Sequence, residues 1–196
     1  MGGESHSADG QAPAPGLLIL TGASHTGKTS VARELLGIVS PPAALLAVDD
    51  TLRHQLVRPP GDPWQQIPLT YELLRPQVEV LLDHNWLVIF ESTFTYVRTT
   101  GEAEFHADEL RRLVQVAEER LVPHLVVQLR ATGAEVRARA RLTGRLAERV
   151  VEQTAKLHDS PDLPHSVLRL DSGNQGPADL AKRSLAALCQ RSSIRN

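Results

Sequence analysis

Five short apolar runs divide the chain, and segments with helical periodicity lie between them. Each run is continuous rather than alternating, as expected for strands that are buried on both faces of a sheet. Strands that alternate with helices predict βαβ units and a parallel sheet covered on both faces. We therefore expect an α/β fold, a three-layer sandwich around a five-stranded parallel sheet. The predicted strands are Leu17–Leu20, Ala44–Val48, Trp86–Phe90, Leu125–Leu129 and Val167–Leu170.

The segments between these strands carry apolar residues at spacings of three and four, which is typical of helices. Pro76 is expected to break or restart one helix, and the proline-rich stretch 58–68 is expected to form an irregular loop. Residues 1–15 are polar and rich in Gly, Ala, Ser and Pro, so we expect a disordered tail there and a single domain over 16–196. The predicted helices are Lys28–Ile38, Leu69–His84, Ala103–Leu121, Ala134–His158 and Pro177–Gln190.

Composition narrows the class of protein. The chain has 196 residues, of which 41% are hydrophobic and 22% are charged, values that suit a soluble globular protein. Its formal net charge of −2 gives no general attraction to nucleic acid or to an anionic membrane. The single cysteine, Cys189, excludes an internal disulfide and fits a reducing compartment. We therefore expect a cytoplasmic protein with no nucleic-acid or membrane partner, and no oligomeric state is predicted.

The pattern Gly22-x-x-x-x-Gly27-Lys28-Thr29 stands between the first predicted strand and the first predicted helix. This is the setting of a phosphate-binding P-loop, in which glycines let backbone N–H groups point at phosphate oxygens. Lys28 would reach the β- and γ-phosphates and Thr29 would bind Mg²⁺. The alternative, an ordinary glycine-rich turn, does not explain why all four positions and both flanking elements agree. The predicted nucleotide-binding residues are Gly22, Ala23, Ser24, His25, Thr26, Gly27, Lys28, Thr29 and Ser30.

Acidic residues follow the second and third predicted strands, where ligands of such sheets bind. Asp49 is the candidate for a base that orients an acceptor hydroxyl, next to the P-loop, and Asp50 is the candidate for a helix cap. Glu91 ends a strand that resembles a Walker-B strand with Glu in place of Asp, and could hold Mg²⁺ or contact the acceptor. A solvated strand-end acid is the alternative for Glu91. Other predicted acceptor contacts are Arg53, Ser92, Thr93 and Phe94.

Arginines recur with a spacing of four in the segment after the fourth strand. Arg137, Arg141 and Arg145 would share one helical face, with Arg139 turned away. Three guanidinium groups on one face repel each other unless they meet anions, so residues 134–158 are expected to form a mobile lid over the phosphates of ATP. The alternatives are a solvated basic face and a nucleic-acid-binding stripe, although no aromatic residues are interleaved here.

Five segments, LTGASHTGKTS, AVDDTL, LVIFESTF, VQLRATGAEVRARARLTGR and LRLDSGNQ, occur in this order along the chain. In these segments the chain resembles the chloramphenicol phosphotransferase group of P-loop small-molecule kinases, with broader similarity to gluconate- and shikimate-kinase-like enzymes. The resemblance implies a P-loop kinase fold with ATP and Mg²⁺ as cofactors, and it places the catalytic base on Asp49. The chain departs from the antibiotic kinase at Glu91-Ser92, so the resemblance leaves the acceptor open. It assigns lid arginines to Arg137, Arg141 and Arg145, and an adenine border to the loop Asp171–Gln175, including Ser172 and Gly173.

The favoured hypothesis is a kinase that transfers the γ-phosphoryl group of ATP to a hydroxyl of a small molecule, such as an antibiotic, nucleoside or sugar. Catalysis would then depend on Asp49, Lys28, Arg137 and Arg141. A nucleotide-dependent regulatory NTPase is the first alternative, but the chain has no [N/T]-K-x-D guanine-recognition motif. A toxin-type kinase or nucleic-acid end kinase is the second, and the near-neutral charge makes nucleic acid a poor acceptor.

Overall fold

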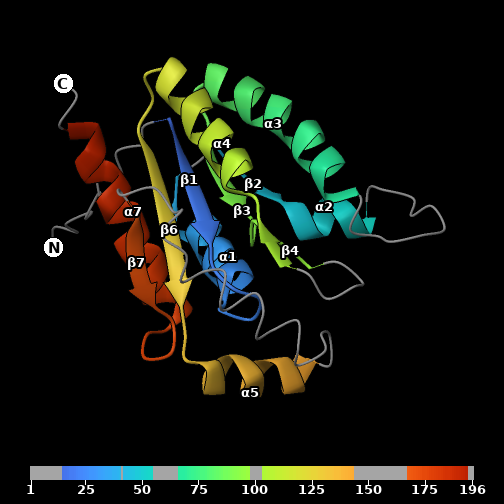
Figure 1. Ribbon diagram of the computed structural model, residues 1–196. Coiled ribbons are helices and arrows are strands. Elements are labelled where there is room, and N and C mark those ends of the chain that lie inside the picture. The colour runs from blue at the N-terminus through green and yellow to red at the C-terminus, as the bar shows by residue number, and fades with distance from the viewer. Residues whose placement is uncertain (1–14, 41, 55–65, 98–102, 144–166, 194–196) are drawn as a thin grey trace, which may run out of the picture.

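The computed structural model describes residues 15–40, 42–54, 66–97, 103–143 and 167–193 (Figure 1). Within these residues a five-stranded sheet has the strand order β2-β3-β1-β6-β7. Every neighbouring pair of strands is parallel, which confirms the predicted sheet. Of the predicted tail over residues 1–15, residues 1–14 lie outside the described residues. The strands are β1 (Gly16–Thr21), β2 (Ala43–Ala47), β3 (Leu87–Glu91), β6 (His124–Arg130) and β7 (Leu168–Asp171).

Helices cover both faces of the sheet, as predicted. Alternate side chains of a strand point to opposite faces, so Leu17 and Ile19 of β1 pack against α3 and α4. Leu18 and Leu20 point the other way, into the apolar cluster that α1 and α7 complete. The sandwich thus has two cores separated by the sheet. The helices are α1 (Lys28–Ile38), α2 (Val48–His54), α3 (Ile67–Asp83), α4 (Ala107–Glu119), α5 (Gly133–Thr143) and α7 (Pro177–Ser193).

The strand order separates the second strand of the chain from the P-loop strand. β3 lies between β1 and β2, and Glu91 at its end pairs with Leu20 in register. Moreover, β2 ends at Ala47, so Asp49 and Asp50 belong to the first turn of α2 rather than to a strand end. The order of strands in a sheet depends on contacts between distant segments, which apolar runs do not encode.

The predicted helix over 103–121 is partly wrong. Residues Ala103–Phe105 form a short strand, β5, which pairs antiparallel with β4 (Thr95–Val97), and the helix covers only Ala107–Glu119. Strands of three residues are too short to show a period of two, so the sequence pattern did not reveal this hairpin.

The expected break at Pro76 is absent, because α3 continues through it as one helix. A proline inside a helix removes one backbone N–H and leaves the carbonyl four residues earlier without its helical donor. That carbonyl belongs to Glu72. Both Pro76 and Glu72 are exposed, so water can satisfy the carbonyl where a buried position could not.

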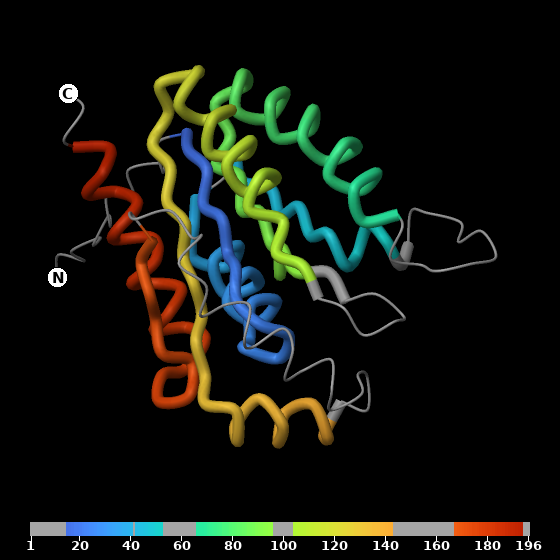
Figure 2. Tube along the Cα trace, in the orientation of Figure 1, coloured from blue at the N-terminus to red at the C-terminus, as the bar shows by residue number. Residues whose placement is uncertain are grey.

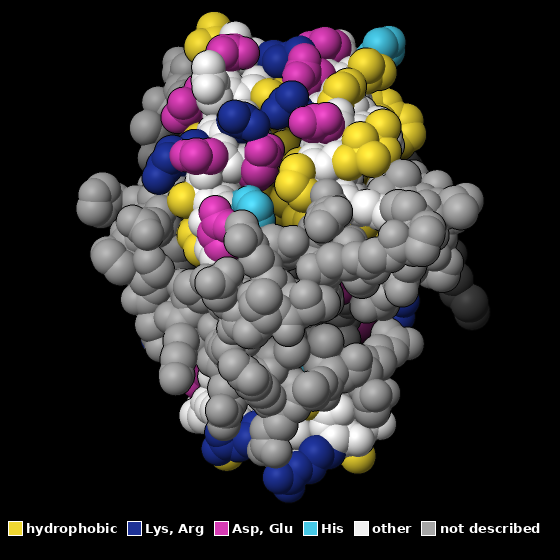
Figure 3. Space-filling model, turned by 45° about the vertical axis from the view of Figure 1, so that its right-hand side comes forward, with side chains coloured by type: hydrophobic (Ala, Val, Ile, Leu, Met, Phe, Trp, Pro, Cys, Tyr) yellow, Lys and Arg dark blue, Asp and Glu magenta, His cyan; other side chains and the backbone are white. Residues whose placement is uncertain are grey.

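The outer surface of α3 carries a row of apolar side chains, visible in Figure 3 on the upper right of the molecule. Leu69, Leu73 and Val80 are 45%, 43% and 57% exposed. The opposite side of α3 is buried, with Tyr71 and Leu74 packed on the sheet. Among the described helices, none combines the length and apolar character that a membrane crossing requires.

All parallel strands of the sheet end at the same edge, at the bottom of Figures 1 and 2. The P-loop follows β1 there, and α5 lies beyond the end of β6. The loop between β7 and α7 turns at the same edge. Because each polar segment singled out in the sequence follows a strand, this edge is where the site must be built.

Candidate active site

The P-loop has the backbone conformation that its glycines allow. Gly22 and Gly27 have φ angles of 142° and 93°, a region that residues with a Cβ rarely adopt. A Cβ at Gly22 would also collide with the carbonyl oxygen of Leu129 and approach Thr26 Oγ1 to 2.9 Å. The loop therefore needs glycine at position 22 for space as well as for conformation. Gly27 is the N-cap of α1, so the positive end of that helix opens into the loop.

Lys28 lies inside the loop and is only 7% exposed. Its Nζ donates hydrogen bonds to the carbonyl oxygens of Gly22 and Ala23, both at 3.0 Å. Burial lowers the pKa of the Lys28 ammonium, and the nearby carboxylate of Glu91 opposes that shift. The ammonium is thus held among backbone oxygens, which phosphate oxygens could replace.

Thr29 and Glu91 form a pair of oxygen ligands beside this lysine. The Thr29 hydroxyl donates to Glu91 Oε1 at 2.7 Å. Within the described part of the chain, the second carboxylate oxygen, Oε2, is buried and has no hydrogen-bond partner. Burial raises the pKa of Glu91, whereas Lys28 and the hydrogen bond from Thr29 lower it. A buried carboxylate oxygen next to a hydroxyl suits a hard cation such as Mg²⁺.

A cleft of about 690 Å³ joins the P-loop to the first turn of α2. Ser24, His25 and Lys28 line one part of it, and Asp49 and Asp50 line another. The cleft thus brings the predicted phosphate-binding loop and the predicted base together, even though β3 separates their strands. Glu91, Thr93, Arg33 and Leu142 also line this cleft.

Not every predicted acceptor contact faces the cleft. Ser92 and Phe94 are 4% and 0% exposed and point into the core of the α3 side, where Phe94 belongs to the apolar cluster. Only Thr93, between them, lines the cleft with Glu91. Arg53 belongs to α2, but its side chain lies outside the described residues.

The arginine that reaches the P-loop is Arg139, which corrects the prediction that it turns away. Its guanidinium donates to the carbonyl oxygens of His25 at 3.3 Å and Ser172 at 2.6 Å. Arg137 and Arg141 line neither cavity described here, whereas Arg139 lines both.

The reason for this difference is the orientation of α5. Val136 and Ala140 are 1% and 7% exposed and mark the face of α5 that packs on the protein. Arg137 and Arg139 flank this face on its two sides, and the side that Arg139 occupies meets His25 and Ser172. Because Arg137 and Arg139 flank Val136 and Ala140 equally, the sequence holds no signal that would have selected Arg139. Arg145 and most of the predicted lid, 144–158, lie outside the described residues.

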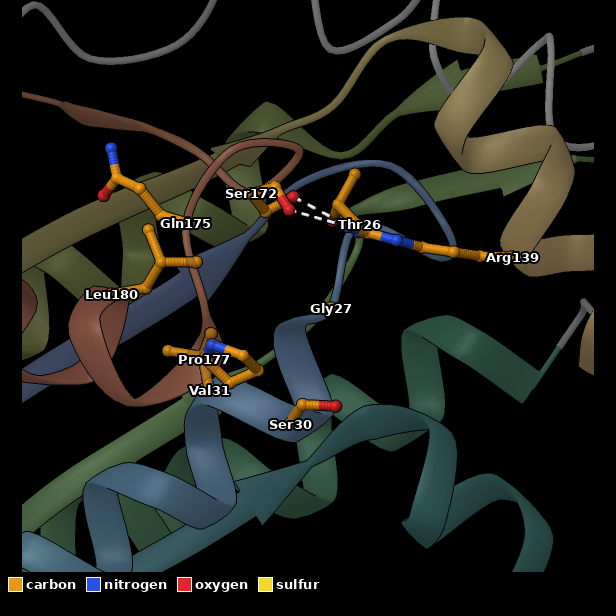
Figure 4. A pocket seen from close by; sticks show the side chains of 9 residues that line it. All are labelled: Thr26, Gly27, Ser30, Val31, Arg139, Ser172, Gln175, Pro177 and Leu180. Carbon is orange, nitrogen blue, oxygen red and sulfur yellow. Dashed lines mark hydrogen bonds between the residues drawn. The ribbon is translucent and has the colours of Figure 1, made fainter.

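A second cavity, of about 230 Å³, lies on the other side of the P-loop (Figure 4). Thr26 and Ser30 line it from the P-loop side, and Arg139 extends from α5 to Ser172 at its rim. The remaining lining residues are Gly27 and Val31 of the P-loop and α1, and Gln175, Pro177 and Leu180 of the β7–α7 loop and α7.

The β7–α7 loop is itself ordered by short contacts. Gly173 donates its backbone N–H to Asp171 Oδ1 at 2.8 Å, and these contacts lower the pKa of Asp171. Gly173 does not line the cavity; it packs instead against the carboxylate of Glu135 in α5. Of the two loop residues predicted to bind nucleotide, only Ser172 borders the cavity.

Comparisons with known proteins agree with this architecture. Residues 17–160 match the AAA domain family AAA_33. The tunicamycin resistance protein of Deinococcus radiodurans has a similar structure, with a TM-score of 0.61 and 17% identity over 88% of this chain and 94% of that chain. A gluconokinase from Sinorhizobium meliloti gives a TM-score of 0.61 at 14% identity, covering 92% of this chain and 95% of that one.

A third similar structure is the Mycobacterium tuberculosis APS kinase CysC in complex with AMPPNP and APS. Its TM-score is 0.56 at 15% identity, over 91% of this chain and 99% of that chain. No curated protein matches the chain in sequence. At these identities the similar structures establish a shared fold.

Proposed function

The chain belongs to the AAA domain family, and from this premise we propose that it is a kinase that transfers the γ-phosphoryl group of ATP to a hydroxyl of a small molecule. One observation carries the proposal. A single cleft contains the P-loop lysine, Lys28, the Thr29–Glu91 pair, and the carboxylate of Asp49. A nucleotide held by the loop would direct its terminal phosphate toward that carboxylate.

The nucleotide would occupy both cavities. The triphosphate would lie along the P-loop, with Lys28 exchanging its contacts to Gly22 and Ala23 for phosphate oxygens. The smaller cavity, between Arg139 and Ser172 of the β7–α7 loop, would take the adenine base. The resemblance to small-molecule kinases supports this assignment, because the corresponding loop borders adenine in them.

The residues present fit Mg²⁺. Glu91 Oε2 is a buried carboxylate oxygen without a hydrogen-bond partner among the described residues, and the Thr29 hydroxyl lies beside the other oxygen. Over the same residues there is no group of three or more His, Cys, Asp or Glu side chains that could hold a metal by itself. This suits Mg²⁺, which usually binds through one or two protein oxygens together with substrate phosphates. When bound, Mg²⁺ would neutralise charge on the phosphates.

Asp49 would act as the base. It would hold the acceptor hydroxyl by a hydrogen bond and take its proton as the hydroxyl oxygen bonds to the γ-phosphorus. The bond between that phosphorus and the oxygen bridging to the β-phosphate breaks, and ADP leaves with the electron pair. Lys28 and Arg139, which both line the cleft, would stabilise the charge on the transferred group.

The acceptor class is a small hydroxylated molecule, such as an antibiotic, nucleoside or sugar. The resemblance to the chloramphenicol phosphotransferase group supports an antibiotic, and chloramphenicol itself is the first compound to test. The acceptor would contact Asp49 and Thr93, which both line the cleft.

The test is a screen of ATP consumption against hydroxylated antibiotics, nucleosides and sugars, with products identified by mass spectrometry. We expect one acceptor class to gain a phosphoryl group. Lys28→Ala should weaken both nucleotide binding and turnover. Lys182→Ala is the matched control, because Lys182 is exposed on α7 and lines neither cavity. A different outcome would point to a regulatory NTPase. In that case the protein would bind AMPPNP, would bind a protein partner only when nucleotide is present, and would phosphorylate none of these compounds.

A further inference from the structure

The turn between β3 and β4 directs alternate side chains to opposite sides. Thr93 lines the cleft together with Glu91 at the end of β3. Ser92 and Phe94 point into the core and are 4% and 0% exposed. The turn therefore has one side that packs in the core, formed by Ser92 and Phe94, and one side that faces the cleft, formed by Thr93. The packing of Ser92 and Phe94 determines the direction in which Thr93 points.

The turn is held in a conformation that its residues do not favour. Phe94 has a φ angle of 49°, in the left-handed region that residues with a Cβ avoid. Such a conformation persists only where surrounding contacts enforce it. The backbone N–H of Phe94 donates to Ser92 Oγ at 3.0 Å, and the Phe94 carbonyl accepts from the N–H of His106 at 2.7 Å.

Tyr71 of α3 also supports the turn from outside. Its hydroxyl shares a 2.6 Å hydrogen bond with Ser92 Oγ, the same atom that accepts the Phe94 N–H. Its ring stacks on Phe94, with centroids 5.6 Å apart and an interplanar angle of 17°, and also on Phe90. Tyr71 is only 3% exposed, and burial raises the pKa of its hydroxyl, so the group stays neutral.

We infer that Tyr71 is a positioning residue, which through its hydrogen bond to Ser92 sets the turn that presents Thr93 to the acceptor. The inference rests on the proposed function in one respect, namely that the acceptor binds in the part of the cleft that Thr93 lines. The contacts that hold the turn do not depend on the proposed function. Tyr71 itself does not line the cleft, so it acts only through Ser92 and Phe94.

Two variants distinguish a positioning role of Tyr71 from a general contribution of its side chain to the stability of the protein. Tyr71→Phe keeps the ring and its stacking on Phe94 and removes only the hydroxyl. Thr70→Val is the matched control on the same helix, because the buried Thr70 hydroxyl donates its hydrogen bond to the carbonyl of Gln66 at 2.9 Å, within α3 and its N-cap rather than to the turn. Both variants lose one buried hydroxyl, and only Tyr71→Phe should loosen the turn.

The first measurement is amide hydrogen exchange of the whole protein. In Tyr71→Phe we expect the amides of Phe94 and His106 to exchange about fivefold faster or more, since one buried hydrogen bond stabilises by roughly 1 kcal/mol. Exchange in β1 and β6 should stay as in the parent. Ser92→Ala also removes the acceptor of the Phe94 N–H, so it should speed exchange at Phe94 at least as much, and adding Tyr71→Phe to it should change nothing further. Unchanged protection at Phe94, or equal loss across the whole sheet, would overturn the inference.

The second measurement is turnover with chloramphenicol, D-gluconate and uridine as acceptor probes. For any probe that the parent phosphorylates, Tyr71→Phe should raise the acceptor KM about fivefold or more and leave the KM for ATP unchanged, whereas Thr70→Val should change neither. An acceptor KM unchanged in Tyr71→Phe would contradict the inference. If the parent phosphorylates none of the probes, the exchange measurement alone decides, so the positioning role and the proposed function fail separately.

Discussion

The guanidinium of Arg139 donates a hydrogen bond to the carbonyl oxygen of Ser172 at 2.6 Å and so joins α5 to the loop between β7 and α7. The same guanidinium reaches the carbonyl of His25 in the P-loop at 3.3 Å. One side chain therefore connects three segments that are far apart in the sequence. It also lines the cleft and the smaller cavity, the two spaces that a nucleotide would fill.

Replacing Arg139 should weaken nucleotide binding. We expect Arg139→Ala to raise the Kd for AMPPNP about 10-fold to 100-fold, because hydrogen bonds to charged groups contribute roughly 1.5–3 kcal/mol. Arg141→Ala is the matched control, since Arg141 is exposed on the same helix and lines neither cavity. Isothermal titration calorimetry would compare the two variants. A larger effect from Arg141 would favour the predicted arginine stripe over Arg139.

Asp49 and its neighbour should differ in their effect on turnover. Asp49→Asn should reduce kcat by about 10²–10⁴, the usual cost of losing a general base, with AMPPNP binding retained. Asp50→Asn keeps the adjacent carboxylate and should lower kcat much less, although both residues line the cleft. Steady-state rates with the acceptor found in the screen would measure both. Equal turnover in Asp49→Asn and the parent would remove Asp49 from the mechanism.

Thr29 should control the pH dependence of Mg²⁺ binding. Burial raises the pKa of Glu91, and the hydrogen bond from Thr29 lowers it. Mg²⁺ needs the ionised carboxylate, so Mg²⁺-dependent AMPPNP binding is lost as pH falls through the pKa of Glu91. Thr29→Val removes one oxygen ligand and should weaken Mg²⁺ binding at every pH; it also removes the hydrogen bond that favours the charged form of Glu91, raises the pKa of Glu91 further, and should move the loss of binding to higher pH. Thr29→Ser keeps the hydroxyl, so its AMPPNP binding should depend on pH as in the parent. If AMPPNP binding by Thr29→Val showed the same pH dependence as the parent, the expectation would be contradicted.

Two glycines should respond in opposite directions to alanine. Gly22→Ala should destabilise the protein by about 1–3 kcal/mol, because its φ of 142° and the nearby Leu129 carbonyl oppose a Cβ. Gly37 lies in α1 with open space around its would-be Cβ, so Gly37→Ala should stabilise by about 0.5–1 kcal/mol. Urea denaturation would measure both. A neutral Gly22→Ala would show that the loop can move away from β6.

The amino-acid sequence by itself determined the elements with strong local signals. Apolar runs such as Leu17–Leu20 predicted the five parallel strands, since burial on both faces favours apolar residues at successive positions of a strand. The spacing of Gly22, Gly27, Lys28 and Thr29 predicted the P-loop, because few other residues permit that backbone. These features depend on neighbours within a few positions.

The tertiary structure alone decided which distant segments meet. The position of β3 between β1 and β2 brings Glu91 beside Thr29, and it follows from sheet pairing rather than from any local pattern. The packing of α5 likewise selected Arg139 over the arginines at spacings of four, because helical periodicity defines faces but does not say which face meets the protein. The sequence specifies which chemical groups the side chains carry, whereas the direction in which each side chain points depends on the contacts that form when separate elements pack.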